Sequence, residues 1–288
     1  MESTNLENLK VPGATLHYEV SGQGPVLLMI CGGPTDAAIY AGIAGALAEN
    51  YTVVRYDPRG NSRSTFDGEP GEQRVEVHSD DAHRLLAAVS DGPAYVLASS
   101  GGALVALDLV ARHPEQVHTL VAHEPPVMEL LPDSERWRSH FQDVYDTYQA
   151  DGVGPAMQKF IAGVESGEGG QPQESAPQEA PVPDMGAMPP EMLEMMGRMA
   201  GNAEFFVGQV MLPFSSYTPD GDALKAASSR IVVAVGEASK GSPIQQAGAT
   251  LAEQIEVELV DFPGDHQGFL THGAEFAEVL GKVLTTGR

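Results

Sequence analysis

The feature that most limits the possible folds of this chain is a regular alternation between short, β-branched apolar segments and longer segments with helical periodicity. This alternation is typical of a mostly parallel sheet with helices on both faces, because parallel strands need helical crossovers that then cover the sheet. The expected strands are 14–20, 26–31, 51–56, 94–98, 118–123, 230–235 and 255–262, and the expected helices between them are 37–49, 79–90, 101–113, 243–254 and 273–284. Their even spacing predicts one α/β sheet rather than two domains.

The alternation is interrupted between His123 and Arg230, where no convincing strand occurs. Two amphipathic helices are expected first, at 133–150 and 155–164. The following segment, about 165–183, is dominated by Gly, Pro, Gln and Glu and is predicted to be a mobile loop, because it has too little apolar surface to offset its ordering entropy. A Met-rich helix is then expected to begin at Pro189-Pro190 and to end near Gly201. We therefore predict a core of residues 1–124 and 228–288 and an inserted helical cap of residues 125–227.

Charge and cysteine content exclude several classes of function. The 288 residues contain 16 Lys and Arg against 40 Asp and Glu, a formal charge of −24 that disfavours binding to nucleic acids and anionic membranes. The single cysteine, Cys31, excludes an internal disulfide and a cysteine-rich metal site. The polar N-terminus lacks a signal sequence, and no apolar run is long enough to span a bilayer. We expect a cytoplasmic protein that acts on a small molecule without a metal or another cofactor.

A serine lies at a sharp strand-to-helix turn. The expected strand 94–98 runs through Ser-Ser-Gly-Gly directly into a helix. Such a nucleophile elbow needs small residues two positions before and two positions after the nucleophile, and Ala98 and Gly102 satisfy this rule for Ser100 but not for Ser99. A helix N-terminus at this point also directs free N–H groups towards a developing negative charge. The alternative is that either serine merely caps the helix.

Beyond this elbow, nearly the whole chain resembles the α/β-hydrolase superfamily. The segment 27–34 ends in Cys-Gly-Gly-Pro and is similar to the strand and His-Gly-Gly-Pro turn of that family. The resemblance implies that the backbone N–H groups of Gly33 and Gly101 form an oxyanion hole. Cys31 stands where the family usually has histidine, but an oxyanion hole made of backbone N–H groups does not require that histidine. For Cys31 itself, a role in packing is favoured over one as a reactive thiol.

Two further loops carry the same resemblance. The segment 54–64 is similar to the family's Tyr-Asp-x-Arg-Gly-x-Gly-x-Ser loop, which implies structural roles for Asp57 and Arg59. The segment 263–269, after the last expected strand, is similar to the family's Pro-Gly-x-His loop and places His266 as the general base. Imidazole suits this role because its near-neutral pKa lets it take the serine proton and return it.

The acidic member of the predicted triad is not at its usual place. After the expected strand 230–235 the family usually has Gly-Glu-x-Asp, whereas this chain has Ser239 at the acidic position and Glu237 two residues earlier. Some relatives use the end of the preceding core strand, where this chain has Glu124. We therefore favour Glu124 over Glu237 as the residue that orients His266.

These residues predict a serine hydrolase of the α/β-hydrolase fold that cleaves a carboxylic ester or lactone through an acyl-Ser100 intermediate. A serine nucleophile argues against dehalogenase and epoxide hydrolase chemistry, which uses aspartate in similar proteins. Met192, Met195 and Met199 are candidates for lining a hydrophobic substrate pocket, with packing of cap on core as the alternative. The rival functions are those of a carbon–carbon bond hydrolase, a proline iminopeptidase, a perhydrolase, or a non-catalytic ligand-binding protein of the same fold.

Overall fold

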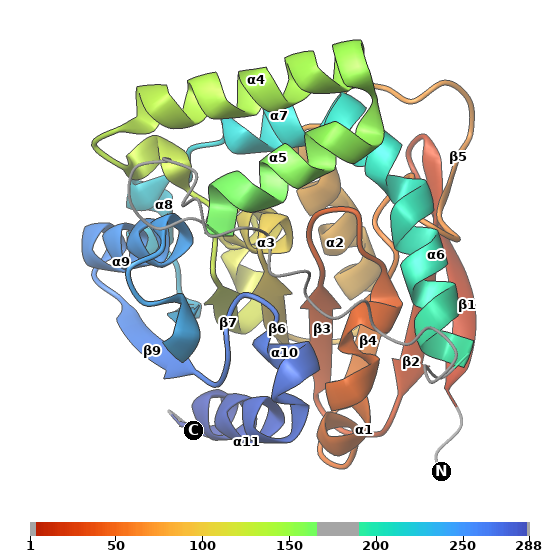
Figure 1. The fold of residues 1–288 in the computed structure, drawn as a ribbon. Coiled ribbons are helices and arrows are strands. Elements are labelled where there is room, and N and C mark those ends of the chain that lie inside the picture. Colours follow the sequence, from red (N-terminus) through yellow and green to blue (C-terminus); the bar gives the residue numbers. More distant parts are fainter. Residues whose placement is uncertain (1–3, 166–189, 287–288) are drawn as a thin grey trace.

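A central β-sheet runs through the protein (Figure 1). The computed structural model describes residues 4–165 and 190–286. Within these residues the sheet has nine strands: β1 (Asn5–Val11), β2 (Ala14–Ser21), β3 (Val26–Ile30), β4 (Thr52–Tyr56), β5 (Thr65–Phe66), β6 (Ala94–Ser99), β7 (Val117–His123), β8 (Arg230–Gly236) and β9 (Glu258–Phe262). Their order is β1-β2-β4-β3-β6-β7-β8-β9, with β5 paired to β2. The strands from β4 to β9 in this order are parallel, which confirms the predicted mostly parallel sheet.

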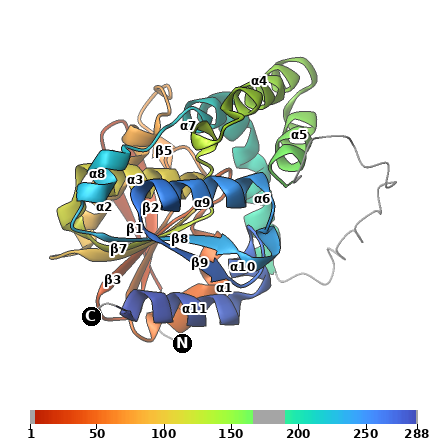
Figure 2. The same ribbon diagram turned by 90° about the vertical axis from the view of Figure 1, so that its left-hand side faces the viewer.

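The two faces of the sheet are covered by different helices, as Figures 1 and 2 show. Alternate residues of β3 divide between two hydrophobic clusters: Leu28 packs with one and Leu27 with the other, as the two-residue period of a strand requires. The first cluster contains α2 (Val75–Val89), α3 (Gly101–Arg112) and α9 (Pro243–Ile255), and the second contains α1 (Ala41–Ala48) and α11 (Gly273–Thr285). Burial on both faces explains why these strands are nearly continuous apolar runs.

The helices of the insertion lie between β7 and β8 in the chain, and Figures 1 and 2 show α4, α5 and α7 gathered outside the sheet. They are α4 (Ser134–Asp151), α5 (Val153–Glu165), α6 (Pro190–Phe205), α7 (Met211–Ser215) and α8 (Gly221–Ala226), with a π-helical turn at Phe206–Val210. Gly152 has a φ of 89° and separates α4 from α5. Apart from Glu165, the predicted loop at about 165–183 lies outside the described residues. The division into core and cap stays a prediction.

Three expectations about the elements were wrong. Strand β1 was missed because Asn5–Val11 is an edge strand whose residues are mostly exposed and polar. The last strand was predicted from residue 255, but Ile255 is the buried end of α9, and Glu256, at a φ of 59°, terminates that helix before β9 begins. The Met-rich helix was expected to end near Gly201, but α6 continues through this glycine, since one helical glycine costs only about 1 kcal/mol.

Short helical turns connect the larger elements. They are Ala37–Tyr40, Pro114–Gln116, Met128–Leu130, Glu237–Ser239 and α10 (Gly268–Thr271). Among the described residues, no helix combines the length and the apolar character needed to cross a membrane.

Candidate active site

Ser100 occupies a tight turn between β6 and α3. Its φ of 55° and ψ of −131° place the backbone in a region that L-residues rarely adopt. The turn lies directly against the end of β3: a Cβ on Gly102 would be 2.4 Å from the Ile30 carbonyl oxygen, and a Cβ on Gly32 would be 2.5 Å from the Gly101 nitrogen. The close approach therefore requires glycine both after β3, at Gly32, and in the turn, at Gly102, as is typical of a nucleophile elbow.

The two adjacent serines have different surroundings. Ser99 is 3% exposed, and its hydroxyl lies 3.2 Å from Nδ1 of the buried His123. Ser100 is half-buried, and its hydroxyl makes no capping hydrogen bond to the described helix α3. This arrangement favours Ser100 over Ser99 as the accessible hydroxyl and speaks against a simple capping role.

Glu124 and His266 come together at the same edge of the sheet, where Glu124 follows β7 and His266 lies in the loop after β9. Nδ1 of His266 donates to Oε2 of Glu124 across 2.6 Å, while the backbone N–H of Gly236 donates to Oε1 across 2.9 Å. Glu124 is fully buried, and the His266 side chain remains 33% exposed. One ring nitrogen is thus held by a buried carboxylate while the imidazole stays accessible.

The electrostatics of Glu124 favour a carboxylate. Burial by itself would raise its pKa, but hydrogen bonds from His266 and from the Ser239 side chain, with the nearby histidine charges, lower the pKa to about 2. Ser239, which stands where the family usually has an acid, is therefore a hydrogen-bond partner of the acidic residue. Glu237 is exposed on the following turn. The structure brings His266 into contact with Glu124.

The predicted oxyanion turn lies next to the elbow. Gly33 has a φ of 62°, and its backbone nitrogen is 3.7 Å from the position that a Cβ on Gly101 would take. Asn61 Nδ2 donates to the Gly33 carbonyl across 3.3 Å and to the Thr35 carbonyl across 2.9 Å. From helix α6, Asn202 Nδ2 donates to the Pro34 carbonyl across 3.0 Å. Side chains from two other parts of the chain thus fix this turn.

Cys31, Asp57 and Arg59 are buried. Burial raises the pKa of the Cys31 thiol to about 12, so the thiol stays protonated and packs as a small apolar group. An oxygen of Asp57 accepts from the Ala37 backbone at 3.0 Å, and Arg59 donates to Asp81 at 2.7 Å. These contacts brace the loops below the candidate site.

The three methionines of α6 lie in different environments. Met195 is buried in the cluster that contains α1 and α11, and Met199 packs against the same cluster. Met192 is 40% exposed. A role in binding substrate stays a prediction for all three.

Sequence reasoning missed four residues near the oxyanion turn: Asn61, His78, Asn202 and Phe214. Ser62, next to Asn61, replaces the second glycine of the loop pattern Arg-Gly-x-Gly, a departure that could have drawn attention to this part of the loop. The other three are brought to the site by the packing of α2, α6 and α7, which no local pattern reveals. Across the described ranges, no cluster of three or more His, Cys, Asp or Glu side chains could hold a metal ion.

Comparison with known proteins agrees with this geometry. Residues 25–272 match the family described as "alpha/beta hydrolase fold". The chain is 37% identical to the "uncharacterized hydrolase YraK" of Bacillus subtilis over 97% of this chain and 96% of that protein. It is 28% identical to a pimeloyl-[acyl-carrier protein] methyl ester esterase of Chromobacterium violaceum over 94% of this chain and 98% of that protein.

Solved structures show the same fold. A thermophilic esterase from Thermogutta terrifontis superposes with a TM-score of 0.72 at 20% identity, covering 99% of this chain and 98% of the esterase. The enol-lactonase from Burkholderia xenovorans LB400 superposes with a TM-score of 0.72 at 16% identity, covering 97% of this chain and 100% of the lactonase. At these identities the likeness concerns the fold alone. With its sheet order, its strand-to-helix serine turn and its match over most of its length, the chain is a hydrolase that belongs to the α/β-hydrolase fold family.

Proposed function

We propose that the protein hydrolyses carboxylic esters or lactones through an acyl-Ser100 intermediate. The observation that carries this proposal is the contact between His266 and the buried Glu124 at the sheet edge where Ser100 forms the elbow. His266 takes the Ser100 hydroxyl proton as Oγ attacks the carbonyl carbon, and the N–H groups of Gly33 and Gly101 stabilise the oxyanion. His266 then protonates the leaving oxygen, the alcohol departs, and water hydrolyses the acyl-enzyme by the same steps.

Glu124 acts in this scheme through His266. Its carboxylate accepts the Nδ1 proton, which leaves Nε2 free to accept the proton of serine, and it stabilises the imidazolium that forms. The hydrogen bond from the Gly236 backbone fixes the second carboxylate oxygen and prevents rotation of the group. Glu124 is therefore a positioning residue, whereas Ser100 and His266 contact the reacting atoms.

The relatives support the choice of ester chemistry. A methyl ester esterase matches the chain over nearly its whole length, and an enol-lactonase shares the fold. The insertion helices also contribute to the surroundings of the oxyanion turn, because Val210 and Phe214 line a cavity together with Gly33 and Gly101. This supports the proposal that residues 125–227 form a cap over the site and that a small molecule binds between cap and core.

The acidic residue provides the sharpest test of the mechanism. Glu124→Gln should lower kcat for an activated ester by a factor on the order of 10² to 10⁴ with little change in KM, because orientation and imidazolium stabilisation are lost together. Steady-state kinetics would measure this effect. Glu237→Gln is the matched control and should remain active, since Glu237 lies exposed on the next turn.

The opposite result would overturn the assignment: a folded Glu124→Gln protein with wild-type kcat, beside an inactive Glu237→Gln protein. An organophosphonate probe separates catalysis from simple ligand binding, because only an activated serine is phosphonylated. Peptide mass spectrometry should find the adduct on Ser100, and an unlabelled protein would favour a ligand-binding function.

A further inference from the structure

A small cavity opens directly beside the predicted oxyanion hole. Its volume is about 20 Å³, and Gly33 and Gly101 form part of its wall. The core supplies most of the remaining wall, and the insertion supplies Val210 and Phe214. The other lining residues are Ile30, Cys31, Gly32, Tyr56, Pro58, Asn61, His78 and Val105. A carbonyl oxygen bound to the two glycine N–H groups would therefore have this cavity next to it.

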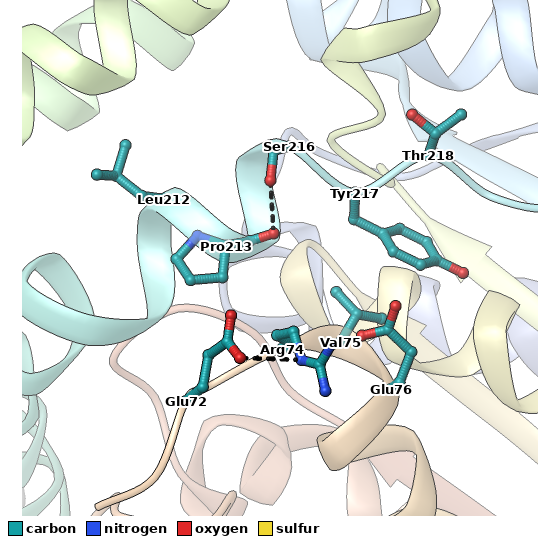
Figure 3. Close-up of a pocket in the computed structure, with 9 residues that line it drawn as sticks. All are labelled: Glu72, Arg74, Val75, Glu76, Leu212, Pro213, Ser216, Tyr217 and Thr218. Carbon is teal, nitrogen blue, oxygen red and sulfur yellow. Dashed lines mark hydrogen bonds and ion pairs between the residues drawn. The ribbon is translucent and has the colours of Figure 1, made fainter.

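A larger pocket lies on the other side of α7. Its volume is about 490 Å³, and Figure 3 shows Leu212, Pro213 and Ser216 above it and Glu72 and Arg74 below it. Leu212 of α7 and Ser216, the residue directly after this helix, line the outer pocket, whereas Phe214 of α7 and Val210, the residue directly before it, line the small cavity. Helix α7 thus separates the outer pocket from the cavity at the oxyanion hole.

The Phe214 ring is the part of α7 that lines the small cavity. Its edge lies 3.4 Å from the position of a Cβ on Gly101. The ring also packs edge-to-face on His78, with the ring centres 5.0 Å apart. His78 Nε2 lies 3.1 Å from Oε1 of Gln73, whose amide nitrogen donates to the Gly71 carbonyl across 2.6 Å. Phe214 is therefore supported by a buried histidine that is itself fixed by hydrogen bonds.

The small cavity stays uncharged. Burial, with a smaller contribution from the Arg59 charge, lowers the pKa of His78 to about 3, so its ring is neutral near pH 7. A neutral imidazole edge and an aromatic ring suit an apolar group rather than a carboxylate or an ammonium group.

The position of the general base identifies which half of an ester occupies this cavity. His266 must protonate the leaving oxygen, so the alcohol lies on the side of His266. The described residues that line the cavity include both oxyanion glycines but not Ser100, His266 or Glu124. The acyl substituent is thus the group that enters it.

We propose that Phe214 is a specificity-determining residue that limits the acyl group to about the size of acetyl, which makes acetate esters the preferred substrate class. A cavity of about 20 Å³ accommodates about one water-sized group, which matches a methyl substituent on the carbonyl carbon. Longer acyl chains would have to displace the Phe214 ring. This inference rests on the proposed function.

The experiment compares 4-nitrophenyl acetate, butyrate and octanoate as substrates of wild type, Phe214→Ala and Leu212→Ala. Wild type should favour acetate over butyrate in kcat/KM by roughly tenfold or more, since one methylene in a tight pocket is worth about 10- to 200-fold. Phe214→Ala should reduce this preference at least about tenfold by gaining activity on butyrate and octanoate. Leu212→Ala is the matched control on the same helix and should keep the wild-type preference, because Leu212 lines only the outer pocket.

Two results would overturn the proposal: wild type that cleaves octanoate as efficiently as acetate, or a folded Phe214→Ala protein with unchanged chain-length preference. If Phe214→Ala does not fold, as its thermal melting would show, Phe214→Leu enlarges the cavity while it keeps an apolar contact and should shift the preference in the same direction. Phosphonate labelling of Ser100 distinguishes the two failures. A labelled enzyme without acetate preference refutes only the acyl-size inference, whereas an unlabelled protein refutes the proposed function.

Discussion

Two residues of the candidate site, Ser100 and Glu124, have positive φ angles of 55° and 48° although neither is glycine. Such conformations cost on the order of 1–3 kcal/mol each and persist only where neighbouring contacts hold them. The Ser100 N–H donates to the His123 carbonyl across 3.0 Å, and the Glu124 N–H donates to the Ala234 carbonyl across 2.8 Å. Both strained residues are thus tied to adjacent strands at the C-terminal edge of the sheet, which fixes their side chains in space.

The elbow glycine gives a prediction about stability. Gly102→Ala should destabilise the protein by about 1–3 kcal/mol, because its Cβ would lie 2.4 Å from the Ile30 carbonyl and the backbone would have to shift. Denaturant unfolding would measure the change. Gly45→Ala is the matched control, since that exposed glycine lies within α1 with no atom within 4 Å of a new Cβ, and it should be stabilising by up to about 1 kcal/mol. Equal stability of the two variants would contradict the close approach of elbow and strand.

Among the helices, α6 makes polar contacts with the oxyanion turn. Asn202 donates to the Pro34 carbonyl, and its Oδ1 accepts from the Ser62 backbone across 2.8 Å. Four residues earlier, Arg198 donates to the fully buried carboxylate of Asp36 across 2.5 Å. One face of an insertion helix therefore holds the turn that carries Gly33, so the position of the helix and the geometry of the turn are coupled.

This coupling predicts an effect on catalysis at a distance from the reacting atoms. Asn202→Ala should lower kcat for an acetate ester by about tenfold, equivalent to ~1.4 kcal/mol, because the Pro34 carbonyl loses its donor and the neighbouring N–H of Gly33 loses its fixed direction. The matched control is Met196→Ala, which alters an exposed residue on the same helix. Kinetics on folded proteins would test this, and wild-type kcat in Asn202→Ala would show that the turn keeps its geometry without α6.

At the scale of elements, the sequence predicted what local patterns determine. The parallel strands were predicted because burial on both faces leaves apolar runs. Ser100 and His266 were predicted as site residues because the loops that carry them have recognisable residue spacing. The exposed strand β1 leaves no such pattern, since its stability depends on pairing with β2. Phe214 and Asn202 reach the site only through the packing of the insertion helices, so no periodicity could have identified them. Glu124 and His266 are 142 positions apart, and their contact was inferred because Ser239 stands at the position where the family usually has the acidic residue.

The molecule as a whole carries a formal charge of −24, yet several of its carboxylates are fully buried. Glu124, Asp36 and Asp57 each accept hydrogen bonds from backbone N–H groups, and all three have charged or ionisable side-chain partners. Burial of a carboxylate is tolerated when such partners replace the lost water. Because the pKa values of Glu124 and Asp36 are lowered in the fold, stability depends on keeping these two carboxylates ionised.

The dependence of stability on the ionisation of Glu124 has a defined pH range. Its pKa is lowered in the folded state from an ordinary 4.5 to about 2, so its ionisation stabilises the fold above pH 4.5, and this contribution is lost as the pH falls towards 2. Glu124→Gln resembles the protonated form. The difference in unfolding free energy between wild type and Glu124→Gln should be largest near pH 6 and should shrink steadily below pH 4.5. Denaturant titrations at a series of pH values would measure it, and a difference that stays constant down to pH 2 would contradict this account.

The buried position of Cys31, the single cysteine of the sequence, has a consequence for covalent chemistry on the intact protein. Its protonated thiol is buried with only 4% of the residue exposed, whereas Ser100 at the neighbouring elbow is half-buried. On the native protein, reagents that alkylate thiols should therefore leave Cys31 unmodified, and reagents that phosphonylate serines should react at Ser100. A maleimide or iodoacetamide probe can be attached at a cysteine introduced elsewhere on the surface without modifying Cys31, and the labelled protein would keep Ser100 unmodified.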